Sequence, residues 1–127
     1  MVGATGAIGT PLIRALRDGG HDVAGTTRNA TKASALQQRG AWGVVLDALD
    51  GDAVMRVVRS LGPDVIVHQA TALPASIDMR RFADTFALTN RLRTEGTRHL
   101  VAASRDVNAR IVPRAMRDGR TRAKVAR

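Results

Sequence analysis

The stretch that decides the fold is Gly3-Ala4-Thr5-Gly6-Ala7-Ile8-Gly9, near the start of the 127-residue chain. Its glycines recur at every third position, and the following apolar residues have the spacing of one buried helix face: Ile8, Leu12, Ala15 and Leu16. Glycine permits positive φ angles and a close approach of the backbone to a pyrophosphate, and the start of a helix offers unpaired N–H groups to an anion. The sequence therefore predicts a phosphate-binding turn; a tight strand-to-helix turn without a ligand is the alternative.

Beyond this turn, short apolar strands alternate with helices. The expected strands are residues 22–27, 44–46, 65–67 and 110–112. Thr31 is the expected N-cap of one helix, and Asp50 or Asp52 that of the next. A long helical stretch is expected over residues 79–104, with Phe82 among its inward-facing side chains.

This alternation predicts an α/β protein with a Rossmann-like, doubly wound parallel sheet that has helices on both faces. Residues 65–67 are apolar throughout, which is typical of a parallel strand that is covered on both sides. Residues 1–112 are the expected binding domain.

The net charge of +9 raises the question of a polyanionic partner. Two-thirds of this excess lies in residues 110–127, which have little apolar periodicity, so residues 113–127 are expected to be a basic, solvated and disordered tail. A non-specific phosphate-binding arm is the alternative. No recognisable nucleic-acid motif supports it, and aromatic residues that could stack on bases make up only 2% of the chain.

The composition excludes several classes of site. The chain has no Cys, which rules out disulfides, a thiolate nucleophile and Cys-ligated metal. No apolar run approaches the ~18 residues of a membrane span and no signal peptide is recognisable, so a soluble, cytoplasmic protein is expected. His21, His68 and His99 form no recognisable acid/base set or metal site, and His68 is expected to be a hydrogen-bonded structural residue.

Polar residues follow three of the expected strands. Arg28 stands where NAD-selective sites place a carboxylate, and an arginine suits a 2′-phosphate, which favours NADP over NAD; a plain surface arginine is the alternative. Asp47 could accept from the adenine amino group or cap a turn. Gln69-Ala70-Thr71 lie at the carboxyl edge of the sheet, where ligands of open α/β sheets bind.

Five stretches together resemble a known family: GATGAIGTPLIRAL (3–16), GHDV (20–23), TTR (26–28), VVLDALD (44–50) and VIVHQATAL (65–73). They look like the amino-terminal half of the NAD(P)-dependent epimerase/dehydratases, which are extended or atypical short-chain dehydrogenase/reductases. The likeness covers about Val2 to Val112 and implies one dinucleotide site. It implies that the pyrophosphate is held by Gly3, Thr5, Gly6, Ala7, Ile8 and Gly9. It places Arg28 at the ribose phosphate, Asp47-Ala48 at the adenine and Gln69-Ala70-Thr71 on the nicotinamide side.

The chain departs from this family in two places. The family's reaction depends on a Tyr four residues before a Lys, and this chain has no Tyr, so no catalytic residue is assigned. Only Met1-Val2 precede the glycines, where the family has a full strand that is central in the order 3-2-1-4-5. The loss of that strand would leave its two neighbours unpaired. These departures suggest a truncated, catalytically incomplete oxidoreductase segment, and leave open a non-enzymatic NADP sensor or a fragment without function; the oligomeric state stays undetermined.

Overall fold

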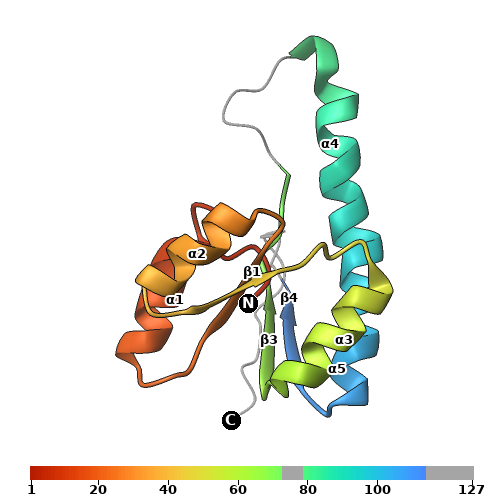
Figure 1. Ribbon diagram of the computed structural model, residues 1–127. Coiled ribbons are helices and arrows are strands. Elements are labelled where there is room, and N and C mark those ends of the chain that lie inside the picture. The colour runs from red at the N-terminus through yellow and green to blue at the C-terminus, as the bar shows by residue number, and fades with distance from the viewer. Residues whose placement is uncertain (73–78, 114–127) are drawn as a thin grey trace, which may run out of the picture.

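The computed structural model describes residues 1–72 and 79–113, which form a parallel sheet between two layers of helices (Figure 1). The strands are β1 (Ala24–Thr27), β2 (Trp42–Val45), β3 (Val65–His68) and β4 (Arg110–Pro113). β1 pairs in parallel with β2, and β3 pairs in parallel with β4.

Val2 joins these two pairs into one sheet. It forms parallel bridges with Thr26 of β1 and with His68 of β3. The Val2 N–H donates to the Val67 carbonyl at 2.8 Å, and the Val2 carbonyl accepts from the Gln69 N–H at 2.8 Å. The spatial order is therefore β2, β1, Val2, β3, β4, which is the predicted order with the first strand at its centre. The sequence prediction that the neighbours of this strand lose their shared partner is wrong, because Met1 accepts a hydrogen bond from Thr26 of β1 while Val2 bonds to the β3 side, at Val67 and Gln69.

The helices between the strands begin and end at recognisable signals. α1 (Gly9–Asp18) and α2 (Ala30–Gln38) lie on one side of the sheet, and α3 (Gly51–Leu61) and α5 (Thr97–Asp106) lie on the other (Figure 1). The Asp50 side chain caps α3, as one of the two predicted candidates, and Gly62 ends it with a φ of 53°. The predicted cap Thr31 is wrong. Asn29 caps α2 instead, because its side chain already accepts from the Lys32 N–H at 3.0 Å.

The expected long helix is divided into four segments. A short 3-10 helix, η1 (Met79–Arg81), leads into α4 (Phe82–Arg91). A π-helical segment, η2 (Leu92–Gly96), then connects α4 to α5. Since α4 extends away from the sheet (Figure 1), Phe82 is 47% exposed and stacks on Phe86, which corrects its expected inward orientation.

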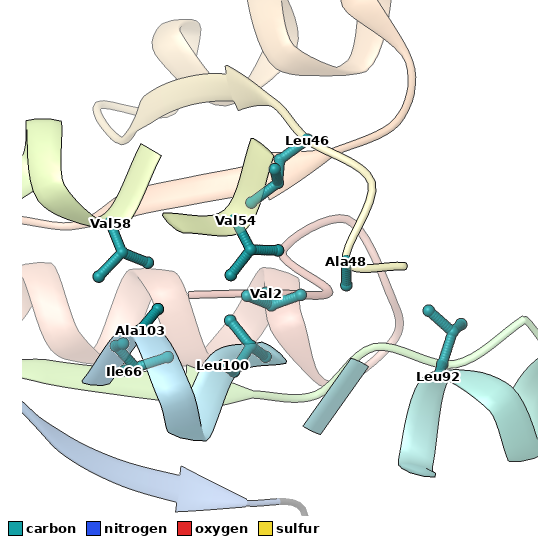
Figure 2. Packing of buried hydrophobic residues seen from close by; sticks show 9 residues of the cluster. All are labelled: Val2, Leu46, Ala48, Val54, Val58, Ile66, Leu92, Leu100 and Ala103. Carbon is teal, nitrogen blue, oxygen red and sulfur yellow. The ribbon is translucent and has the colours of Figure 1, made fainter. Parts of the chain in front are cut away.

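The main hydrophobic core lies between the sheet and the α3/α5 layer (Figure 2). Its buried residues are Val2, Leu46, Ala48, Val54, Val58, Ile66, Leu92, Leu100 and Ala103. A smaller cluster under α1 and α2 consists of Ala4, Ile13, Val23, Leu36 and Ala41.

Two sequence expectations about burial are wrong. In α1 the buried side chain is Ile13, whereas Ile8 is 51% exposed and Ala15 is exposed. Val65 of β3 is 38% exposed, so the apolar run 65–67 is not covered on both sides. An apolar pattern shows which residues can be buried, but not whether another element packs on them.

Two further observations concern the limits of the described chain. No helix within residues 1–72 and 79–113 is long and apolar enough to cross a membrane. The predicted basic tail lies outside the described residues, apart from Pro113, which is the last residue of β4.

Candidate functional site

A cavity of about 520 Å³ opens at the carboxyl ends of the strands, beside residues 3–9, which we call the glycine turn. All of the predicted site residues except Asp47 line it: Gly3, Thr5, Gly6, Ala7, Ile8, Gly9, Arg28, Ala48, Gln69, Ala70 and Thr71. The fold thus brings together segments as far apart in the sequence as Gly3 and Thr71, in a position where open α/β sheets bind ligands.

Each glycine of the turn has a different physical role. Gly3 has a φ of 85°, and a Cβ there would lie 2.5 Å from the carbonyl carbon of Gln69. A Cβ on Gly9 would lie 2.3 Å from the carbonyl oxygen of Gly3. At Gly6, by contrast, the nearest atom to a Cβ would be 3.6 Å away. Gly3 and Gly9 are therefore required by the fold, whereas Gly6 leaves its exposed backbone open to the cavity.

The start of α1 completes the turn. Its N-cap position, Ile8, makes no side-chain hydrogen bond to the helix, and no acidic residue lies in the first helical turn. The Thr10 N–H donates to the Gly6 carbonyl at 3.1 Å and Pro11 has no N–H, so the turn offers its remaining amides, and the positive end of the helix dipole lies at the cavity. This arrangement suits a phosphate oxygen.

The charge at the cavity is positive. Arg28 and Lys32 line it, and no carboxylate is among the described residues that do so. Arg28 follows β1 in a short turn in which the Asn29 N–H donates to Thr27 Oγ1 at 3.3 Å. Lys32 was not predicted. Its position four residues after Arg28, in the first turn of α2, was the signal that could have found it.

Asp47 has a different place from the one expected at the adenine. It does not line the cavity, and its Oδ1 accepts from the Leu49 N–H at 3.0 Å. This bond is an Asx turn, which agrees with the turn-capping alternative. The neighbouring Ala48 does line the cavity and is buried.

His68 lies at the carboxyl end of β3 but does not line the cavity. Its Nε2 is 3.2 Å from the Leu92 carbonyl oxygen, so it is a hydrogen-bonded structural residue, as predicted. Its Nδ1 is buried without a hydrogen-bond partner among the described residues. Burial lowers the pKa of His68, and the hydrogen bond to Leu92 opposes this shift only in part.

The described residues hold no group of three or more His, Cys, Asp or Glu side chains that could bind a metal ion. What the cavity offers is a glycine turn, an uncapped helix start and two cations. These groups can bind an extended anionic ligand.

Comparisons with known proteins point to one family. The model of the NAD dependent epimerase/dehydratase family matches residues 1–114. The 3-diazoavenalumate denitrifying reductase of a Streptomyces species is 47% identical over 110 residues, which cover 87% of this chain and 34% of that protein. The chain therefore spans about a third of the length of this curated relative.

Solved structures share the fold. The UDP-glucose 4-epimerase of Thermus thermophilus, in complex with NAD, has a TM-score of 0.68 at 23% identity, over 85% of this chain and 33% of that one. A blue fluorescent protein from a metagenomic library, in complex with NADPH, has a TM-score of 0.64 at 22% identity, over 88% of this chain and 52% of that one. These two likenesses confirm the predicted Rossmann-like α/β fold.

Proposed function

The chain belongs to the NAD dependent epimerase/dehydratase family, and from that premise we propose that it binds a nicotinamide dinucleotide in the cavity at the glycine turn. The observation that carries this proposal is the backbone of that turn. Gly3 and Gly9 bring the chain into backbone contact with neighbouring segments, and Gly6 stays open beside an uncapped helix start. Such a turn accepts a pyrophosphate without a Cβ in the way.

We further propose that NADP is preferred over NAD. The support is the positive charge after β1, where Arg28 and Lys32 both line the cavity without a carboxylate among its described residues. A 2′-phosphate gains charge-assisted hydrogen bonds from such cations, whereas the carboxylate that would bind a ribose 2′-hydroxyl is missing.

The chain's own residues would bind and orient the dinucleotide. The glycine turn and the start of α1 would hold the pyrophosphate, Arg28 and Lys32 the ribose phosphate, and Gln69–Thr71 the nicotinamide side. A bound nicotinamide would supply hydride transfer. Because the chain contains no Tyr, it lacks the family's Tyr acid/base, and we expect the purified chain to bind the cofactor without turnover.

A titration of the purified 127-residue protein with NADP and NAD, followed by thermal unfolding, tests the proposal. A ligand that binds only the folded state raises the unfolding temperature with increasing ligand concentration. We expect a larger shift with NADP than with NAD. An unchanged unfolding temperature at millimolar concentrations of both would refute dinucleotide binding.

The choice between the two dinucleotides depends on Arg28. We expect Arg28→Asp to weaken NADP binding roughly tenfold or more, since a charge-assisted hydrogen bond contributes about 1.5–3 kcal/mol, and to leave NAD affinity nearly unchanged. Lys32→Asp should act in the same direction. Arg14→Asp, on the exposed side of α1 and away from this cavity, is the matched control. Equal losses for NADP and NAD would remove Arg28 from the site.

A further inference from the structure

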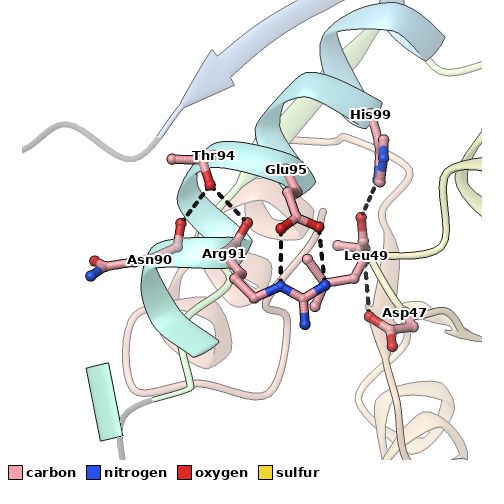
Figure 3. A network of polar contacts seen from close by, with 8 residues as sticks. Asp47, Leu49, Asn90, Arg91, Thr94, Glu95 and His99 are labelled. Carbon is pink, nitrogen blue, oxygen red and sulfur yellow. Dashed lines mark hydrogen bonds and ion pairs between the residues drawn. The ribbon is translucent and has the colours of Figure 1, made fainter. Parts of the chain in front are cut away.

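We propose that His99 is a positioning residue for the adenine end of the dinucleotide, which would lie at Ala48, because Ala48 lines the cavity after β2, next to β1 and the Arg28 that would bind the ribose phosphate. It would act by holding residues 47–50, which we call the 47–50 loop, through a hydrogen bond from α5, the helix that packs beside α3. This inference rests on the proposed function. Its distinctive element is a contact between a helix far along the chain and a loop at the cavity (Figure 3).

The central contact is a hydrogen bond. His99 Nδ1 lies 3.0 Å from the carbonyl oxygen of Ala48, 51 residues away in the sequence. Since a carbonyl oxygen only accepts, Nδ1 carries the proton here. Ala48 is 4% exposed and lines the cavity, so a change in the direction of its carbonyl would change the cavity wall.

The 47–50 loop has internal bonds of its own. The Asp47 side chain accepts from the Leu49 N–H, and the Asp47 carbonyl accepts from the Asp50 N–H at 3.1 Å. These bonds fix the shape of the loop, and the Leu46 N–H, directly before it, donates to the Thr27 carbonyl of β1 at 2.9 Å. Asp50 then caps α3, so the loop's outgoing end is anchored to that helix, while Ala48 projects toward the cavity.

The helix also packs closely on the loop. Gly96 is buried, and a Cβ there would lie 3.6 Å from the Ala48 Cβ. The His99 ring lies against Gly51, where a Cβ would be 3.0 Å from the ring. The half-exposed imidazole thus lies between the Ala48 carbonyl and Gly51 at the start of α3.

The π-helical segment η2 places His99 in this position. One extra residue in a helical turn rotates all following side chains by about 100° relative to an uninterrupted α-helix. Thr94 Oγ1 donates to the Asn90 carbonyl at 2.9 Å, and Arg91 forms a two-bond ion pair with Glu95 across the segment. Figure 3 shows the Arg91–Glu95 pair on the side of the helix toward His99, and the Thr94 bond away from His99.

Arg91 provides a second, electrostatic link to the same loop. Its guanidinium interacts mainly with Glu95, which raises the pKa of Arg91, and Asp47 adds to this effect. Glu95 in turn lies in the field of His99. Two residues of the helical stretch therefore face the 47–50 loop: His99 donates a hydrogen bond to Ala48, and Arg91 carries a positive charge that acts on Asp47.

The expected consequence of removing His99 is a loss of binding affinity that affects only the adenine end of the ligand. Without His99, the buried Ala48 carbonyl would lose its donor, and the loop would have to find another arrangement at a cost in free energy. The hydrogen bond of His99 goes to Ala48 and not to the glycine turn. Adenine-bearing ligands should therefore bind more weakly, whereas pyrophosphate alone should not.

The test compares His99→Leu with His99→Asn in the 127-residue protein. Asn carries its Nδ2 the same number of bonds from Cα as the Nδ1 of His, so it can keep the bond to Ala48. Arg98→Leu, an exposed neighbour on the same helix, is the matched control. Affinities for NADPH, for adenosine 2′,5′-bisphosphate and for inorganic pyrophosphate are measured by calorimetry, with unfolding temperatures for all variants.

We expect His99→Leu to weaken NADPH and the bisphosphate about tenfold, as for a lost hydrogen bond to a buried acceptor, and to leave pyrophosphate within twofold. His99→Asn should recover most of the loss. Equal weakening of all three ligands, or no recovery with Asn, would overturn the proposal. If His99→Leu does not fold, the Asn variant decides, because a normal unfolding temperature with tenfold weaker NADPH binding would contradict the role of Nδ1. If the parent binds no NADPH, the proposed function itself fails.

Discussion

The two halves of the sheet reach the same layered arrangement by different packing. In the β1/β2 half, glycines allow backbones to come very close: a Cβ on Gly43 would lie 1.9 Å from the Ala33 carbonyl oxygen, and one on Gly25 would lie 2.7 Å from the Ala4 Cβ. In the β3/β4 half, aliphatic side chains such as Leu100 fill the space instead (Figure 2). The half that contributes the glycine turn and the two cations is thus packed through close contacts at glycines. The other half is packed by large aliphatic side chains.

The largest effect is expected at Gly43. In Gly43→Ala, the new Cβ would overlap the backbone of α2, which cannot move away as a flexible side chain could. We expect a loss of at least about 4 kcal/mol, enough to abolish a cooperative urea unfolding transition. Gly6→Ala is the matched control, since its Cβ meets no atom within 3.5 Å. A cooperative transition near that of the parent would show that α2 can adjust.

The packing of the β3/β4 half is tested at Leu100 of α5, which is fully buried against α3 and the sheet. Leu100→Ala should lower the free energy of unfolding by about 3 kcal/mol, through lost burial and the cavity left behind. Equilibrium urea denaturation measures this loss. A loss below about 1 kcal/mol would mean that α5 collapses into the space and that this half is not tightly packed.

At Gly6 the effect should be on binding and not on folding. Gly6→Ala adds a methyl group where the glycine turn is open to the cavity, so we expect NADP affinity to fall tenfold or more, about 1.4 kcal/mol, with an unfolding temperature close to that of the parent. Thermal shift with and without NADP measures both quantities. Unchanged affinity would place the pyrophosphate elsewhere.

The smallest effect is a pH dependence of the β3/β4 half. Because burial lowers the pKa of His68 in the folded state, the unfolded chain takes up a proton first as the pH falls through about 6.5. The free energy of unfolding should therefore decrease below that pH, and His68→Gln should flatten the decrease, whereas His21→Gln, at an exposed site, should not. Urea denaturation at pH 7 and pH 5 gives the change in the free energy of unfolding for parent and variant. The difference between these two changes is the contribution of His68.

Much of this fold could be predicted from the sequence because the informative signals are local. The glycine spacing and Asp50 as a cap depend on neighbouring residues, and the structure agrees with both. The family resemblance read from the same stretches is confirmed over residues 1–114. The positions of the predicted cofactor residues around one cavity follow from the parallel strand order, which brings the carboxyl ends together.

The features that escaped prediction depend on contacts between distant segments. Nothing near Gly43 in the sequence shows that the backbone of α2 passes over it, and nothing near Gly25 shows that the side chains of Ala4 and Leu36 pack on it. The π-helical segment η2 interrupts a pattern that also fits a continuous helix, and its effect on His99 is visible only against the 47–50 loop. Val65 was expected to be covered because an apolar strand does not reveal whether a helix lies above it.

The middle of the sheet is narrow, which has a mechanical consequence. Within the described sheet, the β1/β2 and β3/β4 pairs are connected only by the backbone hydrogen bonds of Met1 and Val2. The cavity lies across this connection. A ligand that reaches from Arg28 to Gln69 would contact both strand pairs and so hold them together. We therefore expect amide hydrogen exchange at Thr26 and Gln69 to slow by similar factors when a ligand fills the cavity. The two strand pairs would then unfold together as one unit.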